Sequence, residues 1–212
     1  MKQPKVLFIV HDLYQTDNHF TLGPAYLASI ARINNYAVRV LCCDVFHYSN
    51  DYVCNVITRW NPDIIAIGFL AARFKETVLP LCEAINRVRK KGSRLVLGGH
   101  GATGSPAYVK SVTHADEVIA GEGEEYFGWT SKELDDMPLP AYDLFPIDKY
   151  AECLRLPGWE IGDRTLGVLS SRGCIGRCTF CQRLSRGIRL RSMRSFVDYL
   201  HGDIFYMEVI IL

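Results

Sequence analysis

The sequence predicts a doubly wound α/β protein with a Rossmann-like parallel sheet, and two observations carry this prediction. Short β-branched apolar runs recur along the first two thirds of the chain and are typical of buried strands: Val6–Val10, Val38–Cys43, Ile64–Leu70, Arg94–Gly99 and Glu117–Gly121. Segments with helical periodicity lie between them, so consecutive strands are joined by crossovers and pair in parallel. Ligands of such sheets bind at the carboxyl ends of the strands.

Two of the crossovers carry a clear helical pattern. Pro24–Asn35 places Leu27, Ile30 and Ala31 on one face. Thr77–Lys91 has apolar residues at three- and four-residue spacing and ends in Arg-Lys-Lys-Gly. Both segments are expected to be helices that cover the sheet. The second also has a stop signal, because basic residues in the last turn and a following glycine end a helix.

The bulk composition describes an ordinary globular protein. The chain has 212 residues, of which 49% are apolar and 22% charged, and its net charge of +1 argues against a wholesale electrostatic role on nucleic acid or membranes. Met1-Lys-Gln-Pro4 leads into the first strand without a signal peptide, and no apolar run approaches the ~20 residues that span a bilayer. A reducing cytoplasmic location is therefore expected. The eight cysteines then point to metal binding or redox chemistry rather than to disulfides.

A glycine-rich loop follows the fourth predicted strand. It contains G-x-G-x-x-G at Gly99, Gly101 and Gly104, the spacing of a nicotinamide-binding fingerprint. That fingerprint belongs after the first strand, with an acidic residue ~20 positions later, and neither condition holds, so we reject this interpretation. Two interpretations stay open, a backbone that passes close to a bulky ligand and a plain turn.

Several short motifs occur in the order found in one protein family. They are Thr21-Leu-Gly-Pro-Ala-Tyr-Leu-Ala28, the turn Asn34-Asn-Tyr-Ala-Val38, Gly98-Gly-His100 and Gly121-Glu-Gly-Glu124. From Met1 to about Tyr126 the chain resembles the cobalamin-binding domain of the radical SAM superfamily. The resemblance implies a corrinoid over the strand ends, in a site lined by His11, Asp12, Phe69, Leu70, Gly98, Gly99, His100, Gly121 and Glu122.

The chain departs from the corrinoid methyltransferase pattern D-x-H-x-x-G, whose histidine ligates cobalt from below. Asp17-Asn-His19-Phe-Thr-Leu-Gly23 has one residue too many between histidine and glycine. With Gly23 in register, the ligand position falls on Phe20, which cannot coordinate a metal. Many radical SAM relatives lack this histidine, and His19 is then a solvated loop residue. His100 has a similar alternative, as a turn residue that makes a backbone hydrogen bond.

Periodicity fades from Phe127 to Arg164, which the sequence predicts to be a linker. Prolines in Asp135-Asp-Met-Pro-Leu-Pro140 and Leu144-Phe-Pro146 are spaced as in an extended connector. The segment resembles the one that joins the two domains of the family, and an ordinary surface loop is the alternative. The chain is thus predicted to contain a cobalamin-binding-like domain at 1–126, a linker at 127–164 and an incomplete N-terminal piece of a radical SAM core at 165–212.

Three closely spaced cysteines follow a predicted strand at Thr165–Ser170. Cys174, Cys178 and Cys181 form C-x-x-x-C-x-x-C, without the second pair of ligands that a structural zinc site needs. Three thiolates suit a 4Fe–4S cluster that keeps one iron open for a non-protein ligand, whereas electron-transfer clusters are held by four cysteines. The other cysteines have no such spacing and are expected to be core or surface thiols: Cys42, Cys43, Cys54, Cys82 and Cys153.

With Ser171-Arg-Gly before it, the cysteine spacing resembles the radical SAM cluster motif. The resemblance implies that S-adenosylmethionine binds the open iron and is cleaved to a 5′-deoxyadenosyl radical, which abstracts hydrogen from a substrate. Phe180 is expected to pack beside the bound adenine.

Arginines dominate the flanks of the cysteines. The interval from Arg172 to Arg194 holds seven arginines and no Asp or Glu. Three interpretations stay open: the arginines stabilise the cluster, they face RNA, or they form a solvated surface that also contacts the rest of the radical SAM core.

The chain ends in an apolar segment, Phe205–Leu212, after a helix expected at Phe196–His201. By the resemblance this segment is the second strand of a six-strand partial (β/α) barrel. Since chains rarely end inside a buried-type strand, we expect the 212 residues to be a fragment of a longer enzyme, inactive alone.

The leading hypothesis is the N-terminal part of a cobalamin-dependent radical SAM enzyme that transfers methyl from methylcobalamin to an unreactive carbon. The implied cofactors are a 4Fe–4S cluster, S-adenosylmethionine and cobalamin. The expected partners are a small-molecule or natural-product substrate and an electron donor such as flavodoxin or ferredoxin. No membrane is expected, and a nucleic-acid partner is disfavoured but stays open. Two alternatives stay open: a radical SAM enzyme whose α/β domain lost the corrinoid and became a docking module, and a non-catalytic Fe–S protein.

Overall fold

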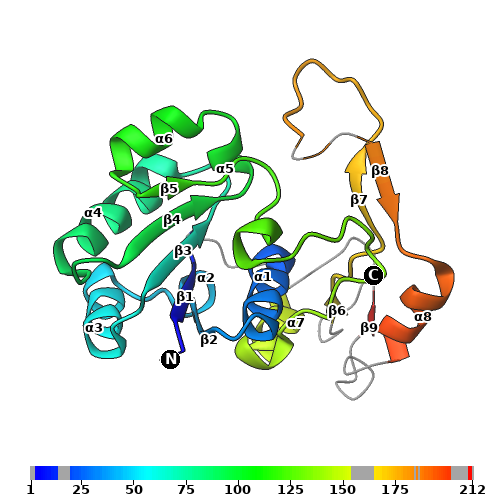
Figure 1. Cartoon of the computed structure of the whole chain (residues 1–212), viewed down its shortest axis with the longest axis horizontal. Helices are drawn as coiled ribbons and strands as arrows, with labels where there is room; N and C mark the ends of the chain where they lie inside the picture. The colour runs from blue at the N-terminus through cyan, green and yellow to red at the C-terminus, as the bar shows by residue number, and fades with distance from the viewer. Residues whose placement is uncertain are drawn as a thin grey trace.

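The structure of the chain, a computed structural model, describes residues 3–13, 20–153, 165–183, 185, 187–201 and 210–211. Figure 1 shows a layered α/β part and, beside it, a smaller group of strands and helices from the C-terminal part of the chain. Most of the predicted strand Phe205–Leu212 and residues 154–164 of the predicted linker lie outside the described residues.

Five parallel strands form the main sheet, in the order β2-β1-β3-β4-β5. They are β1 (Lys5–Val10), β2 (Ala37–Cys42), β3 (Ile64–Gly68), β4 (Arg94–Gly98) and β5 (Glu117–Val118). Phe8 of β1 lies opposite Val40 of β2 and Ala66 of β3. The predicted Rossmann-like parallel sheet is confirmed, with its last strand shorter than expected.

Helices cover both faces of the sheet because side chains alternate along each strand. The helices are α1 (Leu22–Ile33), α2 (Cys43–Phe46), α3 (Asn50–Trp60), α4 (Leu79–Val88), α5 (His100–Thr103) and α6 (Pro106–Thr113). Leu7 and Ile9 of β1 belong to a buried cluster with residues of α3, α4 and α6. Val6 and Phe8 belong to a second cluster with α1 and Phe127. The strands are therefore buried on both faces, which explains their continuous apolar runs.

Both predicted helices are present. Pro24–Asn35 corresponds to α1, whereas Thr77–Lys91 begins within a π-helical turn at Phe74–Val78 and continues as α4. The sequence did not single out α3, although Ser49 caps it by accepting a hydrogen bond from Tyr52 N at 3.3 Å. Among the described residues, no helix is long and apolar enough to cross a membrane.

The described part of the predicted linker is packed rather than extended. It contains a 3-10 turn at Tyr142–Leu144 and the helix α7 (Ile147–Cys153). The rings of Tyr142, Phe145 and Tyr150 surround Phe20, with centroids 5.3 or 5.4 Å away. Proline spacing indicated a connector, but the aromatic residues among the prolines bury their rings against the sheet domain.

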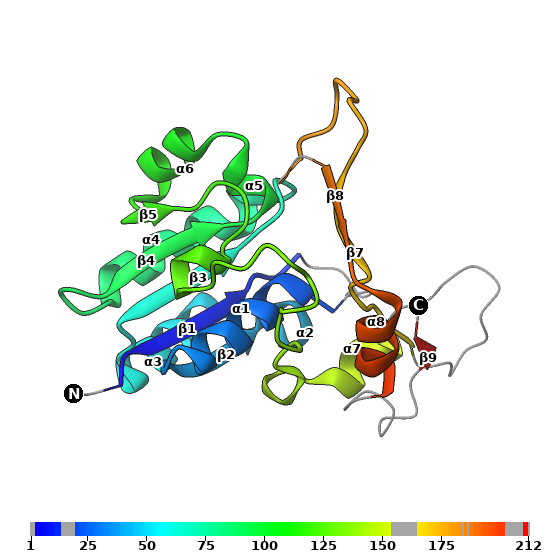
Figure 2. The same ribbon diagram turned by 45° about the vertical axis from the view of Figure 1, so that its right-hand side comes forward.

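The C-terminal part contains two small sheets and one helix. β6 (Thr165–Leu166) pairs in parallel with β9 (Ile210–Ile211), and β7 (Ser171–Cys174) pairs antiparallel with β8 (Gly187–Leu190), followed by α8 (Met193–His201). Figure 2 shows β7 and β8 as a long hairpin whose loop projects beside α5. The sequence did not predict this hairpin, because β7 (Ser171-Arg-Gly-Cys174) shows no alternating apolar pattern, although Ile188 and Leu190 of β8 alternate with arginines. A barrel beyond these strands stays a prediction.

A buried polar cluster joins the C-terminal part to the sheet domain. The hydroxyls of Tyr142 and Tyr199 lie 2.6 Å apart, and Tyr26 donates to Tyr199 at 3.5 Å. Arg191 donates to the Tyr26 hydroxyl at 3.3 Å and to Leu169 O at 3.1 Å. Burial raises the pKa of Tyr142 and of Tyr199 well above the usual range, so the hydroxyls stay protonated. Each hydroxyl of this tyrosine cluster, and the Arg191 guanidinium, therefore has a hydrogen-bond partner, as burial requires.

A buried carboxylate joins α2 to α7. Asp44 is 4% exposed, and the Tyr150 hydroxyl lies 3.0 and 2.9 Å from its two oxygens. Burial raises the pKa of Asp44 to about 6, although the hydrogen bond from Tyr150 acts in the opposite direction.

The raised pKa of Asp44 predicts a stability that falls as pH rises. The folded chain keeps this carboxyl protonated up to about pH 6, whereas the unfolded chain loses the proton near pH ~4, so ionisation disfavours folding above that window. We expect Asp44→Asn to be more stable than wild type at pH 8, by about 1–3 kcal/mol, and to lose this advantage at pH 4. Thermal unfolding followed by circular dichroism checks this, with Asp51→Asn at an exposed position as the control. An offset that is equal at both pH values would contradict it.

Candidate functional site

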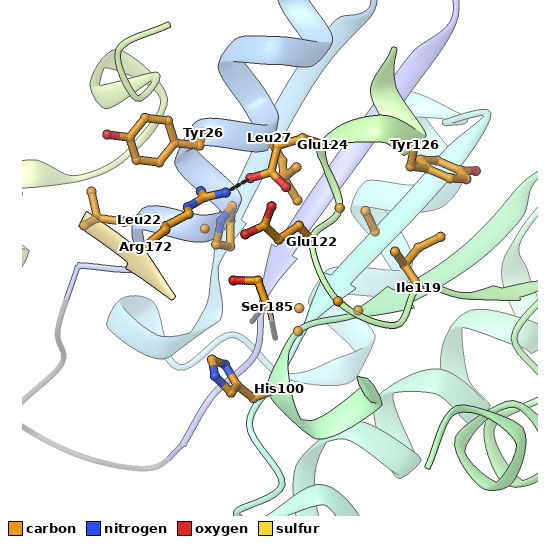
Figure 3. A pocket seen from close by; sticks show the side chains of 18 of the residues that line it. Leu22, Tyr26, Leu27, His100, Ile119, Glu122, Glu124, Tyr126, Arg172 and Ser185 are labelled. Carbon is orange, nitrogen blue, oxygen red and sulfur yellow. Dashed lines mark hydrogen bonds and ion pairs between the residues drawn. The ribbon is translucent and has the colours of Figure 1, made fainter. Parts of the chain in front are cut away.

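A cavity of about 570 Å³ lies between the carboxyl ends of the strands and the β7–β8 hairpin. The sheet side of its wall includes bare backbone and apolar side chains: Phe8, Leu27, Ala66, Val96, Gly98, Gly99, Ile119 and Phe127. The hairpin side contributes Arg172, Cys174, Cys181 and Gln182. Figure 3 shows Arg172 and Glu124 facing each other at the wall. A mostly apolar hollow with a few polar groups is typical of a cofactor or small-molecule site.

Five of the residues predicted to line a corrinoid site lie in the wall of this cavity. They are Gly98, Gly99, His100, Gly121 and Glu122. The lining does not include His11, Asp12, Phe69 and Leu70. Whether any of the nine contacts a ligand stays a prediction.

His11 and Asp12 are engaged at the end of β1 instead. His11 is 6% exposed, and its Nδ1 lies 3.2 Å from Gly68 O. Burial lowers the pKa of His11, so the imidazole is neutral at pH 7. Asp12 lies 2.8 Å from Nδ1 of His47. Both side chains are therefore engaged by other residues of the sheet domain.

The glycine-rich loop packs closely against other segments of the protein. Gly99, at the wall of the cavity, has a φ of +86°, which favours glycine. A Cβ on Gly101 would lie 2.5 Å from the ring of Phe69, and a Cβ on Gly104 would collide with the side chain of Gln182. Of the two open interpretations, close approach therefore holds for Gly101 and Gly104, but the bulky neighbours there are protein side chains.

Two carboxylates of the turn after β5 hold arginines of the hairpin. Glu122 pairs with Arg189, and Glu124 pairs with Arg172. The second pair is largely buried, with side chains 16% exposed for Arg172 and 10% for Glu124. Arg172 also lies over the ring of Tyr26, 5.6 Å from its centroid. These two arginines dock the hairpin onto the sheet domain and do not form a solvated surface.

All three cysteines of the spaced motif are exposed, and Cys174 and Cys181 line the cavity. Within the part of the chain that the structure describes, no three Cys, His, Asp or Glu side chains are grouped closely enough to hold a metal ion. The donor set still suits an iron–sulfur cluster. A Cβ on Gly176 would lie 3.2 Å from Cys174 Sγ and 3.6 Å from Cys178 Sγ, so the glycine keeps the space between these sulfurs open. Phe180 is 91% exposed, and its role beside an adenine stays a prediction.

The other described cysteines belong to the packing of the sheet domain. Cys42, Cys43 and Cys82 are buried, and burial raises the pKa of each thiol to about 12. They are therefore protonated and poor metal ligands at neutral pH. Cys54 is partly buried, and the side chain of Cys153 lies outside the described residues.

The segment that departs from the D-x-H-x-x-G pattern lies only partly within the described residues. Asp17, Asn18 and His19 lie outside the described residues. Phe20, in the register position, packs into the aromatic cluster of the linker and offers no metal ligand.

Sequence reasoning missed several residues of the site. Leu27, Val96 and Phe127 have the pattern of ordinary core residues, so nothing distinguished them as cavity wall. Arg172 and Glu124 stood in recognised motifs, but no local signal pairs residues this far apart in the chain.

An open parallel sheet with a cofactor-sized cavity at its strand ends defines a Rossmann-like ligand-binding domain. Residues 15–128 match the family of B12 binding domains, more than half of the chain. The chain belongs to this family.

Two curated relatives are methyltransferases by name. An uncharacterized methyltransferase of Pyrococcus horikoshii, PH0819, is 27% identical over 195 residues, covering 76% of this chain and 40% of that protein. Cytidylyl-2-hydroxyethylphosphonate methyltransferase of Streptomyces wedmorensis is 34% identical over 207 residues, covering 71% of this chain and 39% of that protein. The chain thus spans about 40% of the length of these relatives.

Solved structures share the fold over nearly the whole chain. The cobalamin-dependent S-adenosylmethionine radical enzyme OxsB, with aqua-cobalamin and S-adenosylmethionine bound, has a TM-score of 0.72 at 17% identity, covering 94% of this chain and 31% of that chain. The radical S-adenosylmethionine methyltransferase TsrM from Kitasatospora setae, with cobalamin and a [4Fe-4S] cluster bound, has a TM-score of 0.63 at 15% identity, covering 95% and 47%.

The largely buried pair of Arg172 and Glu124 is expected to hold the hairpin in place. Arg172→Met leaves a buried carboxylate unpaired and should lower the free energy of unfolding by about 3 kcal/mol, whereas adding Glu124→Leu should recover most of the loss. Urea unfolding measures both. Lys132→Met breaks the exposed pair with Glu125 and should change stability by less than about 1 kcal/mol. A double variant as unstable as the single one would contradict this role.

The close approach of Gly101 to Phe69 makes a second stability prediction. Gly101→Ala inserts a methyl group 2.5 Å from the ring and should lower the free energy of unfolding by about 1–3 kcal/mol. Gly68→Ala is the matched control, because a Cβ there meets nothing within 4 Å. Equal urea midpoints for the two variants would show that the loop does not depend on this contact.

Proposed function

We propose that this chain is the cofactor-binding part of a cobalamin-dependent radical SAM methyltransferase. One observation carries the proposal: the glycines at the strand ends of a B12 binding domain and two cysteines of a C-x-x-x-C-x-x-C motif line the same cavity. The names of the curated relatives and the cofactors of the structural neighbours support it.

The sheet side of the cavity would hold the corrinoid. Gly98, Gly99 and Gly121 present backbone without side chains, which lets a large planar ring approach the strand ends. Leu27 and Phe127 offer apolar surface to the part of the ligand that enters between α1 and the sheet. Phe20 packs into the aromatic cluster, and its ring has no atom that could coordinate a metal.

The hairpin side would hold the iron–sulfur cluster through Cys174, Cys178 and Cys181. The corrinoid would supply a methyl group for transfer, and the cluster with S-adenosylmethionine would supply radical chemistry. The chain's own residues bring these two chemistries together, because Arg172 and Glu124 keep the cysteine strand at the rim of the cavity. Positioning of this kind is a main source of rate acceleration.

The partners follow from this chemistry. The substrate would be a small molecule or natural product with an unreactive carbon that receives the methyl group. A flavodoxin or ferredoxin would deliver electrons at the exposed cysteine loop.

Anaerobic reconstitution of the 212-residue chain with iron, sulfide and hydroxocobalamin tests the proposal. We expect about four irons per chain, an EPR signal after reduction that Cys178→Ala abolishes, and corrinoid absorbance that stays with the protein. Gly98→Val should weaken corrinoid binding at least about tenfold, because it puts a side chain into the cavity wall, where the nearest atoms are 3.9 Å from a Cβ.

Cys54→Ala is the control for the cluster, since this thiol lies outside the spaced motif. A cluster signal unchanged by Cys178→Ala would defeat the proposal. A cluster without corrinoid binding would favour the docking-module alternative. Corrinoid binding without a cluster would limit the chain to a B12 binding protein.

A further inference from the structure

Gln182 follows directly on Cys181 and contacts the opposite wall of the cavity. Its Nε2 donates a hydrogen bond to the carbonyl oxygen of His100 at 2.8 Å, between residues 82 positions apart in the chain. The same amide fits against Gly104, where any Cβ would collide with Gln182 Oε1. The side chain of Gln182 is therefore located by a polar contact and by the recess at Gly104, where an added Cβ would displace the amide.

This contact joins two sets of residues that the proposed function assigns to different cofactors. Cys181 belongs to the cysteine motif, and His100 begins α5 directly after Gly99 of the strand-end loop. The same cavity is lined by residues of both sets: Cys181, Gln182, Gly99 and His100. Because Gln182 is the next residue after Cys181, a movement of the cysteine loop moves the amide that holds the His100 carbonyl.

We propose that Gln182 is a positioning residue that couples cluster assembly on Cys181 to corrinoid binding at the His100 loop. The inference rests on the proposed function, since it needs both cofactors. A cluster that holds Cys181 also holds Gln182 against His100, so the corrinoid wall is ordered before the ligand arrives. Such coupling is reciprocal. It is measured as the ratio of the corrinoid affinities of the chain with and without the cluster.

The test measures this ratio in the 212-residue chain. The Kd of hydroxocobalamin is determined by anaerobic absorbance titration, first for the apo chain and then for the chain reconstituted with iron and sulfide and desalted. We expect the reconstituted wild type to bind about fivefold more tightly, the effect of one hydrogen bond. Gln182→Glu should bring the ratio to about one, because the carboxylate keeps the size of the side chain but cannot donate to the carbonyl.

Gly104→Ala disrupts the contact between Gln182 and the His100 loop from the side of the sheet domain. It leaves the amide intact but fills the recess, so it should also bring the ratio to about one. Gln3→Glu and Gly167→Ala are the matched controls, one at an exposed position and one where a Cβ meets nothing within 4 Å. Both controls should keep the wild-type ratio.

The outcomes separate this inference from the proposed function. A wild type that fails to load either cofactor overturns the proposed function, and the positioning role with it. A wild type that loads both cofactors with a ratio of one, or with a ratio that Gln182→Glu leaves unchanged, overturns the positioning role alone. Iron content, measured for every variant, shows whether the cluster is present.

Discussion

The parallel pairing of β1, β3 and β4 is the constraint on which the rest of the structure depends. In register, Val10 lies opposite Gly68, and Gly68 lies opposite Gly98, so the three strands end level at one edge of the sheet. Every loop that leaves this edge starts beside the others. The glycines at the ends of β3 and β4 keep side chains out of the space above the edge, and the cavity occupies that space.

The hairpin closes the cavity through polar contacts more than through apolar packing. Arg172 and Arg189 reach carboxylates of the turn after β5, and Arg191 enters the buried tyrosine cluster. Charge-assisted contacts of this kind have strict geometry, so they fix the position of a strand that buries little apolar surface. Placement of the cysteine motif is thus set by residues outside the motif. The ion pairs of the hairpin therefore determine where the proposed cluster would lie relative to the strand ends.

The sequence predicted the sheet well because its signals are local. A buried strand of a parallel sheet must be apolar on both faces, so β1 and β3 are visible as continuous runs such as Val6–Val10 and Ile64–Ile67. The cysteine motif is equally local, since its chemistry depends on spacing within one loop. The hairpin and the packed linker were not predicted, because their stability comes from partners such as Tyr26 and Glu124 that are distant in the chain.

In the candidate site, too, the features that depend on local sequence were predictable and those that depend on distant contacts were not. By itself the sequence determined the fold class, the glycine loops at the strand ends and the three spaced thiols, because each depends on residue type and local order. Only the tertiary structure decided that Cys174 and Cys181 share a cavity with Gly98 and Gly99, and that His11 and Asp12 lie outside its wall. Which residues meet across the cavity depends on how the hairpin docks. That docking depends on ion pairs and buried hydrogen bonds between distant segments, which no local pattern records.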